Sequence, residues 1–357
     1  MKRFAVICLM TWSFLVTGTS QPPAGYYDSA GELTGKALQQ ALHDIIDNHT
    51  VVSYSGLYSC FITTDVKPGS VVWDMYSDMP GGTPAYVYYY SGGQECGNYD
   101  SEADCYNREH SFPKSWFDNE SSPMYSDLFH IYPTDGYVNN RRANYPMGET
   151  ASATWTSTNG SMVGPSSLSG YSGIVFEPID EYKGDFARTY FYMATRYYGE
   201  DSSWPGSDMT TGAEPKPWAM TMLLAWHRTD AVSTKETDRN NEVYKYQNNR
   251  NPFIDDPQFA EKIWGTLNPV SEIAADNVAA LLYPNPASDK VHLQVTDYEC
   301  SGAEAYIYDL SGCLVRAITI EEGVTFFEVS ELQSGIYFVR ILCDQRVVTG
   351  TFVIGHR

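Results

Sequence analysis

Two stretches decide the fold: Tyr106-Asn-Arg-Glu-His-Ser-Phe-Pro-Lys-Ser-Trp116 and Leu128-Phe-His-Ile-Tyr-Pro-Thr-Asp-Gly-Tyr-Val-Asn-Asn-Arg-Arg-Ala-Asn-Tyr-Pro146. The first brings a Glu-His pair to the end of an apolar, aromatic run. The second predicts a short strand, a Pro-Thr-Asp turn and a short helix, for which Thr134 is the expected N-cap. The two stretches together predict a hairpin followed by a short helix, with polar side chains gathered where the two meet.

The side chains on this unit have the chemistry that phosphodiester hydrolysis requires. His110 can take a proton from water because imidazole titrates near neutral pH. Glu109 and Asn139 offer hard oxygen ligands, which suit Mg²⁺ or Ca²⁺ and not zinc. A cation held by only two protein ligands keeps open positions for phosphate, as a catalytic Mg²⁺ requires.

Four nearby cations are candidates for holding the phosphate. Arg142 lies one helical turn after Asn139, so both side chains can face the same phosphate. Arg141, Arg108 and Lys114 are the further candidates, and arginine is favoured for bidentate phosphate contact. Taken singly, these residues more often have structural roles, since asparagine caps helices and adjacent arginines form solvated faces. Their occurrence together around one turn favours the functional interpretation.

Glu109 and His110 present a geometric problem. Adjacent residues on a regular strand point to opposite faces of the sheet. Both can serve one site only if the backbone is irregular there, or if Glu109 reaches around the strand edge. Pro113, three residues later, is consistent with a strand end at this position.

The composition limits the class of protein. The 357 residues suffice for two domains, and the formal net charge is -21. That charge argues against tight, charge-driven binding to duplex DNA, but not against an enzyme that contacts a few phosphates. Lys2-Arg3, an apolar run and small residues near position 20 predict a signal peptide. In the oxidising compartment that this implies, Cys96 and Cys105 are expected to form a disulfide.

Hydrophobic periodicity predicts the remaining elements. Helices are expected from Leu33 to His49 and over 183–198, 218–227, 236–250 and 257–264. Strands are expected within 51–65, 71–77, 85–90 and 174–178, and the polar stretch 150–172 is either short strands or a surface excursion. In the last part of the chain, short alternating runs over 291–295, 303–308, 314–320, 325–329, 336–342 and 347–354 predict a small all-β sandwich.

The two opening stretches resemble the bacterial endonuclease I family, which comprises secreted or periplasmic nucleases with a ββα-metal (His-Me finger) site. The resemblance runs from about Leu33 to Phe259 and includes Val72-Trp-Asp-Met-Tyr-Ser-Asp78, Lys183-Gly-Asp-Phe-Ala-Arg188 and Asn249-Arg-Asn-Pro-Phe253. It implies His110 as general base and Glu109 and Asn139 as ligands of Mg²⁺, with Ca²⁺ or Mn²⁺ as alternatives. It further implies a monomer that cuts DNA, and often RNA, without sequence specificity and leaves 5′-phosphates.

Two departures from the family pattern matter. Many members carry His-His or His-Asn before the proline turn, whereas this chain has Phe129-His130, and a structural hydrogen bond is the expected role of His130. The span 118–127 contains no arginine, although some members carry a phosphate-clamping arginine between the two segments. Arg142 or Arg188 would have to replace it.

The last part of the chain resembles the C-terminal sorting domain of the type IX secretion system. The matching pieces are Tyr283-Pro-Asn-Pro-Ala-Ser-Asp289, Tyr308-Asp-Leu-Ser-Gly312 and Leu332-Gln-Ser-Gly-Ile-Tyr-Phe-Val-Arg340. This resemblance implies the type IX machinery as partner, and export through the periplasm to the cell surface or the medium.

The expected organisation is an α+β nuclease domain with a ββα-metal core, followed by a small all-β sandwich. The expected bounds are a signal peptide at 1–20, the nuclease domain at 21–268, a linker at 269–280 and the sorting domain at 281–357. No other membrane-spanning segment is expected.

A secreted carbohydrate-active or adhesive protein is the competing hypothesis. Aromatic residues make up 14% of the chain, and Glu177 with Asp180 or Glu181 forms a carboxylate pair of the kind that glycoside hydrolysis uses. Acidic surfaces contain such pairs by chance, so this signal is weak. Activity on polysaccharide without activity on plasmid would favour it.

Overall fold

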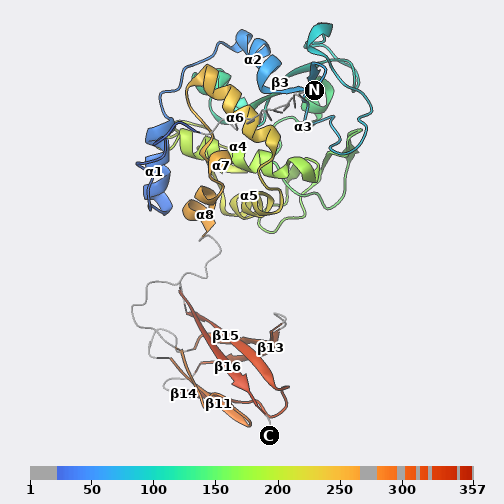
Figure 1. Ribbon diagram of the computed structural model, residues 1–357. Helices are drawn as coiled ribbons and strands as arrows, with labels where there is room; N and C mark the ends of the chain where they lie inside the picture. Colours follow the sequence, from blue (N-terminus) through green and yellow to red (C-terminus); the bar gives the residue numbers. More distant parts are fainter. Residues whose placement is uncertain are drawn as a thin grey trace, which may run out of the picture. The chain divides into compact units, whose positions relative to one another are not determined.

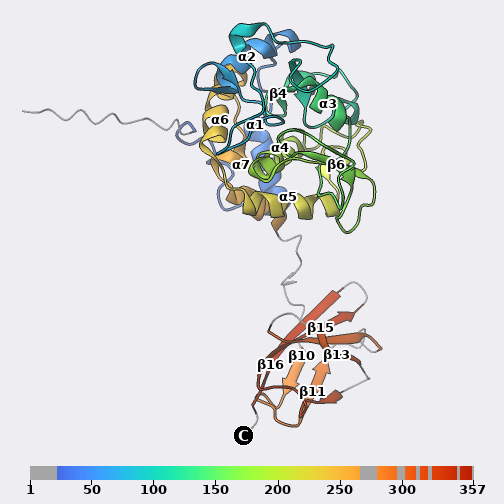
Figure 2. The same cartoon turned by 90° about the vertical axis from the view of Figure 1, so that its right-hand side faces the viewer.

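The computed structural model describes residues 22–265, 280–295, 302–310, 314–320, 324–343 and 346–355. The chain divides into two compact units, and the division falls between Asn268 and Pro269 (Figures 1 and 2). The signal peptide expected at 1–20 lies outside the described residues, as does the expected linker apart from Ala280. None of the described helices combines the length and the apolar character needed to cross a bilayer.

The first unit mixes helices with short strands. Its helices are α1 (Gly35–Ile46), α2 (Leu57–Thr64), α3 (Gly136–Arg142), α4 (Lys183–Arg196), α5 (Pro217–Thr229), α6 (Thr234–Gln247), α7 (Pro252–Asp255) and α8 (Gln258–Trp264). Its strands are β1 (Val66–Lys67), β2 (Val71–Val72), β3 (Tyr106–His110), β4 (Ile131–Asp135), β5 (Trp155–Thr156), β6 (Met162–Pro165), β7 (Ile174–Glu177), β8 (Thr210–Thr211) and β9 (Glu214–Pro215). Its sheets have two or three strands each, so the helices carry most of the core.

Helix α4 is the centre of this unit. Every residue of α4 is buried, as expected for a helix that is surrounded by others. It contacts α1, α5 and α7, and Figure 1 shows it in the middle of the helical layer. Helix α1 packs through Leu38, Leu42 and Ile46, which are fully buried and recur at the spacing of one helix face. The helices expected at 33–49, 183–198, 218–227, 236–250 and 257–264 are thus confirmed as α1, α4, α5, α6 and α8.

Strands β3 and β4 and helix α3 form the unit that the opening stretches predict. The two strands pair antiparallel, from Tyr106 opposite Asp135 to His110 opposite Ile131, without a register shift. Helix α3 follows β4 directly and contacts both strands; Figure 2 shows it beside β4. The expected N-cap was wrong by one residue: Thr134 still belongs to β4, and the Asp135 carboxylate accepts from the backbone N–H of Val138 at 2.9 Å.

Two of the expected strands were also wrong. The segment from Leu57 to Thr64 is helix α2, because its buried residues follow a helical spacing and their packing outweighs the β-propensity of the sequence. Residues 85–90 contribute only an isolated bridge, between Tyr89 and Val71. Of the strand expected at 71–77, only the two residues of β2 are extended and paired. The expected disulfide between Cys96 and Cys105 is present just before β3.

The second unit is all-β in its described residues. Its strands are β10 (Ala280–Tyr283), β11 (Lys290–Val295), β12 (Glu304–Tyr308), β13 (Leu314–Thr319), β14 (Val324–Glu328), β15 (Gly335–Cys343) and β16 (Arg346–Ile354). They form one sheet in the order β10-β11-β14 and another in the order β13-β12-β15-β16. Both sheets contribute to one core, which includes Val291, Phe327, Ile307, Ile341 and Phe352. The alternating pattern of the sequence placed β11 to β16 within one residue at each end, whereas it did not predict β10.

Candidate active site

Glu109 and His110 lie on opposite faces of strand β3. The register with β4 is regular through both residues, so successive side chains alternate. Glu109 contacts Tyr76 and Arg142 on the face that α3 covers. The His110 ring instead lies parallel to the Tyr54 ring on the other face. The backbone of β3 is therefore regular at these two residues. Glu109 and His110 can act on one substrate group only if that group lies at the edge of the strand, where both side chains can reach it.

Helix α3 is attached to β3 by two pairs of side chains. Asn139 donates from Nδ2 to Oδ1 of Asn107 at 2.7 Å. One turn later, Nη1 of Arg142 lies 3.5 Å from Oε1 of Glu109. Arg142 is only 1% exposed, and its guanidinium also donates to the carbonyl of Ser111 at 2.6 Å and to that of His110 at 3.3 Å. The Arg142 side chain thus faces the interior and holds the end of β3.

Glu109 and Asn139 each keep one oxygen without a protein partner in the described part of the chain. The phenol of Tyr76 donates to Oε1 of Glu109 at 2.9 Å, and no described group donates to Oε2. The amide of Asn139 uses its nitrogen for Asn107, which leaves Oδ1 free. Burial raises the pKa of Glu109 above its ordinary value, and the charge of Arg142 and the hydrogen bond from Tyr76 offset only part of this shift. A carboxylate oxygen and an amide oxygen are the donors that a hard divalent cation prefers, so these residues fit such an ion.

His110 has one ring nitrogen engaged and one free. Its Nε2 lies 3.1 Å from the carbonyl oxygen of Tyr125, and because a carbonyl only accepts, we assign the proton to Nε2. No group among the described residues hydrogen-bonds to Nδ1, which then carries a lone pair. Burial, followed by the charge of His130, lowers the pKa of His110 to about 3, so the ring is neutral at neutral pH. His110 therefore has the protonation state of a general base, with Nδ1 as the accepting atom.

The four candidate phosphate contacts differ in whether a carboxylate already neutralises their charge. Of the eight arginines in residues 22–265, six have a carboxylate oxygen within 4.0 Å, and only Arg108 and Arg141 have none. Arg108 lies on β3 and Arg141 on α3, so both uncompensated charges flank the candidate site. Lys114 is exposed, and its ammonium lies 4.0 Å from the Glu120 carboxylate. Arg188, the other possible replacement for a clamping arginine, is fully buried and ion-paired with Glu236.

Two tyrosines that the sequence patterns missed lie beside His110. The Tyr54 and Tyr125 rings stack with centroids 4.1 Å apart. The Arg108 guanidinium lies over Tyr54 at 3.7 Å, and the Lys114 ammonium over Tyr125 at 5.6 Å. Tyr54 precedes β3 by about fifty residues in the sequence, so only the fold brings it to the site, and no local motif could have indicated it.

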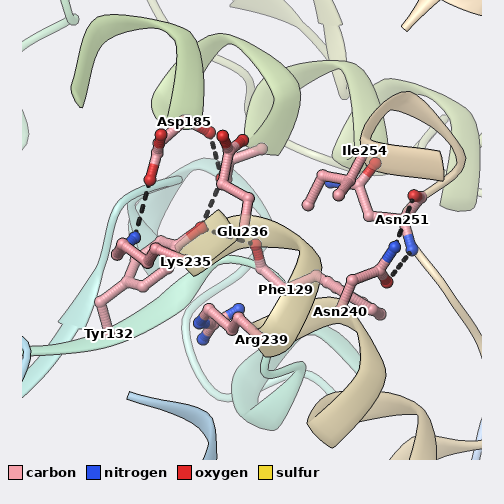
Figure 3. Close-up of a pocket in the computed structure, with 10 residues that line it drawn as sticks. Phe129, Tyr132, Asp185, Lys235, Glu236, Arg239, Asn240, Asn251 and Ile254 are labelled. Atoms are coloured by element: carbon pink, nitrogen blue, oxygen red, sulfur yellow. Dashed lines mark hydrogen bonds and ion pairs between the residues drawn. The ribbon is translucent and has the colours of Figure 1, made fainter. Parts of the chain in front are cut away.

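A buried ionic network on α6 contacts strand β4 and the segment before it. Arg239 on α6 donates to the carbonyls of Leu128 and Ile131, at 2.6 and 3.0 Å, and pairs with Asp65. Figure 3 draws Arg239 with Asp185, Lys235 and Glu236 among the residues that line one cavity. The volume of this cavity is about 10 Å³. That volume holds roughly one water molecule. The cavity is therefore too small to hold a nucleotide, and a substrate that reaches β3 must bind outside it.

Two other polar clusters have protein cations at their centre. The group His43, Asp47 and Glu200 has the composition of a metal site, but Arg196 pairs with both carboxylates at 2.9 Å and opposes a second cation there. Of the three carboxylates considered for glycoside hydrolysis, Glu177 and Asp180 pair with Lys183, at 3.0 and 2.8 Å, so neither of the two proposed pairs has both members free. Neither cluster offers a free pair of ligands or acids.

Comparison with known proteins finds a family match for each of the two units. The profile of the endonuclease I family matches residues 34–258, and that of the secretion system C-terminal sorting domain matches residues 281–355. An extracellular ribonuclease of Bacillus amyloliquefaciens is 35% identical over 247 residues, which are 67% of this chain and 78% of the relative. The extracellular ribonuclease of Bacillus subtilis is 33% identical over 246 residues, with the same two coverages of 67% and 78%. An endonuclease-1 of Buchnera aphidicola is 27% identical over 129 residues, 36% of this chain and 46% of the relative.

The family decides between the two hypotheses drawn from the sequence. Members of this family are nucleases and generally depend on a divalent metal ion. The match therefore favours the nuclease hypothesis over the carbohydrate-active alternative. The sorting domain marks the protein for secretion to the cell surface or the medium. The chain belongs to the endonuclease I family, as a secreted nuclease that carries a C-terminal sorting domain.

Proposed function

We propose that β3, β4 and α3 form a ββα-metal site that hydrolyses phosphodiester bonds in DNA and RNA without sequence specificity. The relatives bear the names extracellular ribonuclease and endonuclease-1, which supports cleavage of RNA and cleavage within a nucleic acid chain. The single observation that carries the assignment is the state of His110. Its Nε2–H is fixed on the carbonyl of Tyr125, and its Nδ1 is free to accept a proton.

His110 is the proposed general base. Its Nδ1 takes the proton of the attacking water, and the charge that develops on the ring is shared with the Tyr125 carbonyl through Nε2–H. The same hydrogen bond fixes the ring orientation, so Nδ1 does not have to be reoriented in the reaction. A ring that is neutral in the resting site is available as a base over the whole neutral range.

Glu109 and Asn139 are the proposed ligands of Mg²⁺, with Ca²⁺ and Mn²⁺ as alternatives for a metal titration to separate. Such a cation, when bound, neutralises charge on the leaving oxygen and the phosphate. Asn107 turns the Asn139 amide so that its oxygen stays free. Arg142 holds the Glu109 carboxylate by one oxygen and leaves the other available. We therefore propose Arg142 as a positioning residue, in place of the direct phosphate contact that its spacing from Asn139 predicts.

The proposed path of the substrate follows the free edge of β3. In the described part of the chain this strand pairs with β4 on one side, and on its other side it has a single bridge, between Tyr106 and Glu95. A phosphate placed over that edge is approached by Glu109 from one face and by His110 from the other. Arg108 and Arg141 are the proposed contacts for the flanking phosphates, because their charges are uncompensated and phosphate is the anion that arginine binds best. Lys114 adds a third cation on the His110 side.

The test is plasmid and RNA digestion by the His110→Ala variant. The variant should lose cleavage of both substrates, while its melting temperature stays close to that of the wild type. His43→Ala is the matched control, since it removes a histidine that is similarly buried but lies on α1, and it should retain activity. Wild-type cleavage by folded His110→Ala would refute the assignment.

The second unit has a proposed role in export alone. The family of sorting domains to which it belongs suggests the type IX secretion machinery as its partner. Deletion of residues 281–357 should leave the nuclease inside the cell envelope, measured by the activity of medium against that of cells. Equal activity in the medium with and without the deletion would exclude this role.

A further inference from the structure

The His110 face of β3 carries a column of stacked groups. Tyr54 lies between the Arg108 guanidinium at 3.7 Å and the Tyr125 ring at 4.1 Å. Because both neighbours approach this closely, they must occupy its two opposite faces. One face of Tyr125 is therefore covered by Tyr54, and the Lys114 ammonium lies 5.6 Å from its ring centroid. That separation leaves the outer face of Tyr125 without close contact from this ammonium.

The column adjoins the proposed general base. The His110 ring is nearly parallel to Tyr125 and Tyr54, at interplanar angles of 16° and 20°, with centroids 5.5 and 5.9 Å away. These distances exceed that of a direct stack, so His110 lies beside the column. A flat group placed on the outer face of Tyr125 would thus lie near the His110 ring and alongside Lys114. Both tyrosines are part-exposed, and neither belongs to the fully buried core.

The charge of the column fits a nucleic acid. Arg108 has no carboxylate within 4.0 Å among the described residues, and it donates to the carbonyl of Tyr54 at 2.8 Å, which keeps the cation in place. The stacked pair Tyr171 and Trp218, elsewhere on the same unit, lies 4.7 Å apart with no cation over either ring among the described contacts. Arginine and lysine beside exposed aromatic rings form the arrangement that holds unstacked bases through their faces and the backbone through its phosphates.

We propose that Tyr54 and Tyr125 form a base-stacking platform that makes the enzyme prefer single-stranded over duplex nucleic acid. The bases of a duplex are already stacked on one another and cannot lie on Tyr125 unless they leave the helix. In a single strand the face of every base is accessible, and stacking on an aromatic ring does not depend on sequence. The proposal rests on the proposed function, because it concerns the substrate of the same site.

The test compares cleavage of one oligonucleotide as a single strand and as a duplex, in DNA and in RNA. The wild type should cut the single strand faster. Tyr125→Leu should lower kcat/KM on the single strand by about 10-fold or more, the effect of one lost base-stacking contact. Tyr54→Leu should also lower it, because Tyr125 then loses the ring that supports its inner face. Both variants should change duplex cleavage much less. The carbonyl that holds His110 belongs to the backbone, so these variants keep the base in place.

Two further variants separate stacking from simple packing. Tyr125→Phe keeps the ring and removes only the hydroxyl, so it should retain the single-strand preference. Tyr171→Leu removes a ring of similar exposure outside the platform and should leave both rates unchanged. An unaltered ratio of single-strand to duplex cleavage in folded Tyr54→Leu and Tyr125→Leu would overturn the platform and leave the proposed function standing.

Binding without cleavage gives an independent readout. In the presence of a chelator, the full chain should bind a labelled single strand more tightly than the duplex, as measured by fluorescence anisotropy. Tyr125→Leu should lose this difference, and Tyr171→Leu should keep it. If the wild type cuts no nucleic acid, the proposed function fails, but the binding measurement still tests the platform. Equal single-strand binding by the wild type and Tyr125→Leu would exclude a stacking role for Tyr125.

Discussion

Replacing Arg142 separates the two roles that this residue could have. Its guanidinium is buried, faces Glu109 at 3.5 Å and donates to the carbonyls of His110 and Ser111. In Arg142→Ala, Glu109 would stay buried without its charged partner, and both carbonyls would lose a donor. Breaking a buried pair by removing one partner costs about 3–5 kcal/mol. For a domain of this size each kcal/mol lowers the melting temperature by roughly 2–4 °C, so a fall of about 6–20 °C is expected.

The neighbouring arginine provides the matched control. Arg141 is exposed and contacts the Tyr137 hydroxyl, with no carboxylate nearby among the described residues. Arg141→Ala should therefore change stability by no more than about 0.5 kcal/mol while raising KM for nucleic acid. Thermal unfolding followed by circular dichroism, with steady-state cleavage on the same samples, measures both effects. If Arg142→Ala melts with the wild type and only weakens substrate binding, the positioning role is wrong and Arg142 contacts phosphate.

Three further predictions concern the metal, the pH and the disulfide. Glu109→Gln and Asn139→Ala should each raise the Mg²⁺ concentration that gives half-maximal cleavage, and an unchanged titration would exclude them as ligands. Burial alone would raise the pKa of Asp127, but His49 and hydrogen bonds from Gln247 and neighbouring donors lower it to about 2. A carboxylate whose pKa is lowered in the folded state stabilises the fold fully at pH values above its unfolded pKa, near 3.8, and loses this contribution as the pH falls through about 2. The difference in unfolding free energy between the wild type and Asp127→Asn should therefore shrink by about 2 kcal/mol between these two pH values. A difference that stays constant with pH would contradict this prediction. Replacing Cys96 and Cys105 by alanine should lower the unfolding free energy by about 2–3 kcal/mol, as expected for a short closed loop, and a denaturant titration that shows no loss would contradict it.

Helical periodicity was the most reliable signal in the sequence. Leu38, Leu42 and Ile46 predicted α1 because one buried face was enough to define it. Helix α2 was mistaken for a strand because its short run of β-branched and aromatic residues suits either structure, and only the packing of Leu57 and Phe61 decides between them. The strand expected at 85–90 failed for the opposite reason, since a strand requires a partner and the fold supplies only one bridge, at Tyr89.

The candidate site was predictable only as far as local spacing reaches. Glu109, His110 and Asn139 follow from two short stretches, and their proposed roles still await the variants described above. The spacing of Asn139 and Arg142 correctly put both on one face of α3, but it could not show that this face packs on β3, where Arg142 is buried. Tyr54 and Tyr125 could not be found at all, because tertiary packing alone brings them to His110.

Residues 22–265 contain only two arginines without a carboxylate partner, and this number sets the salt dependence expected of the proposed phosphate contacts. A protein that neutralises many phosphates gains most of its affinity from released counterions and loses it steeply in salt. With Arg108 and Arg141 as the main contacts on a chain of net charge -21, affinity should fall only about tenfold between about 50 and 200 mM salt. With so few phosphate contacts the polymer should dissociate after each cut, so distributive cleavage is expected. Activity should also persist at salt concentrations that dissociate a strongly basic nuclease from its substrate.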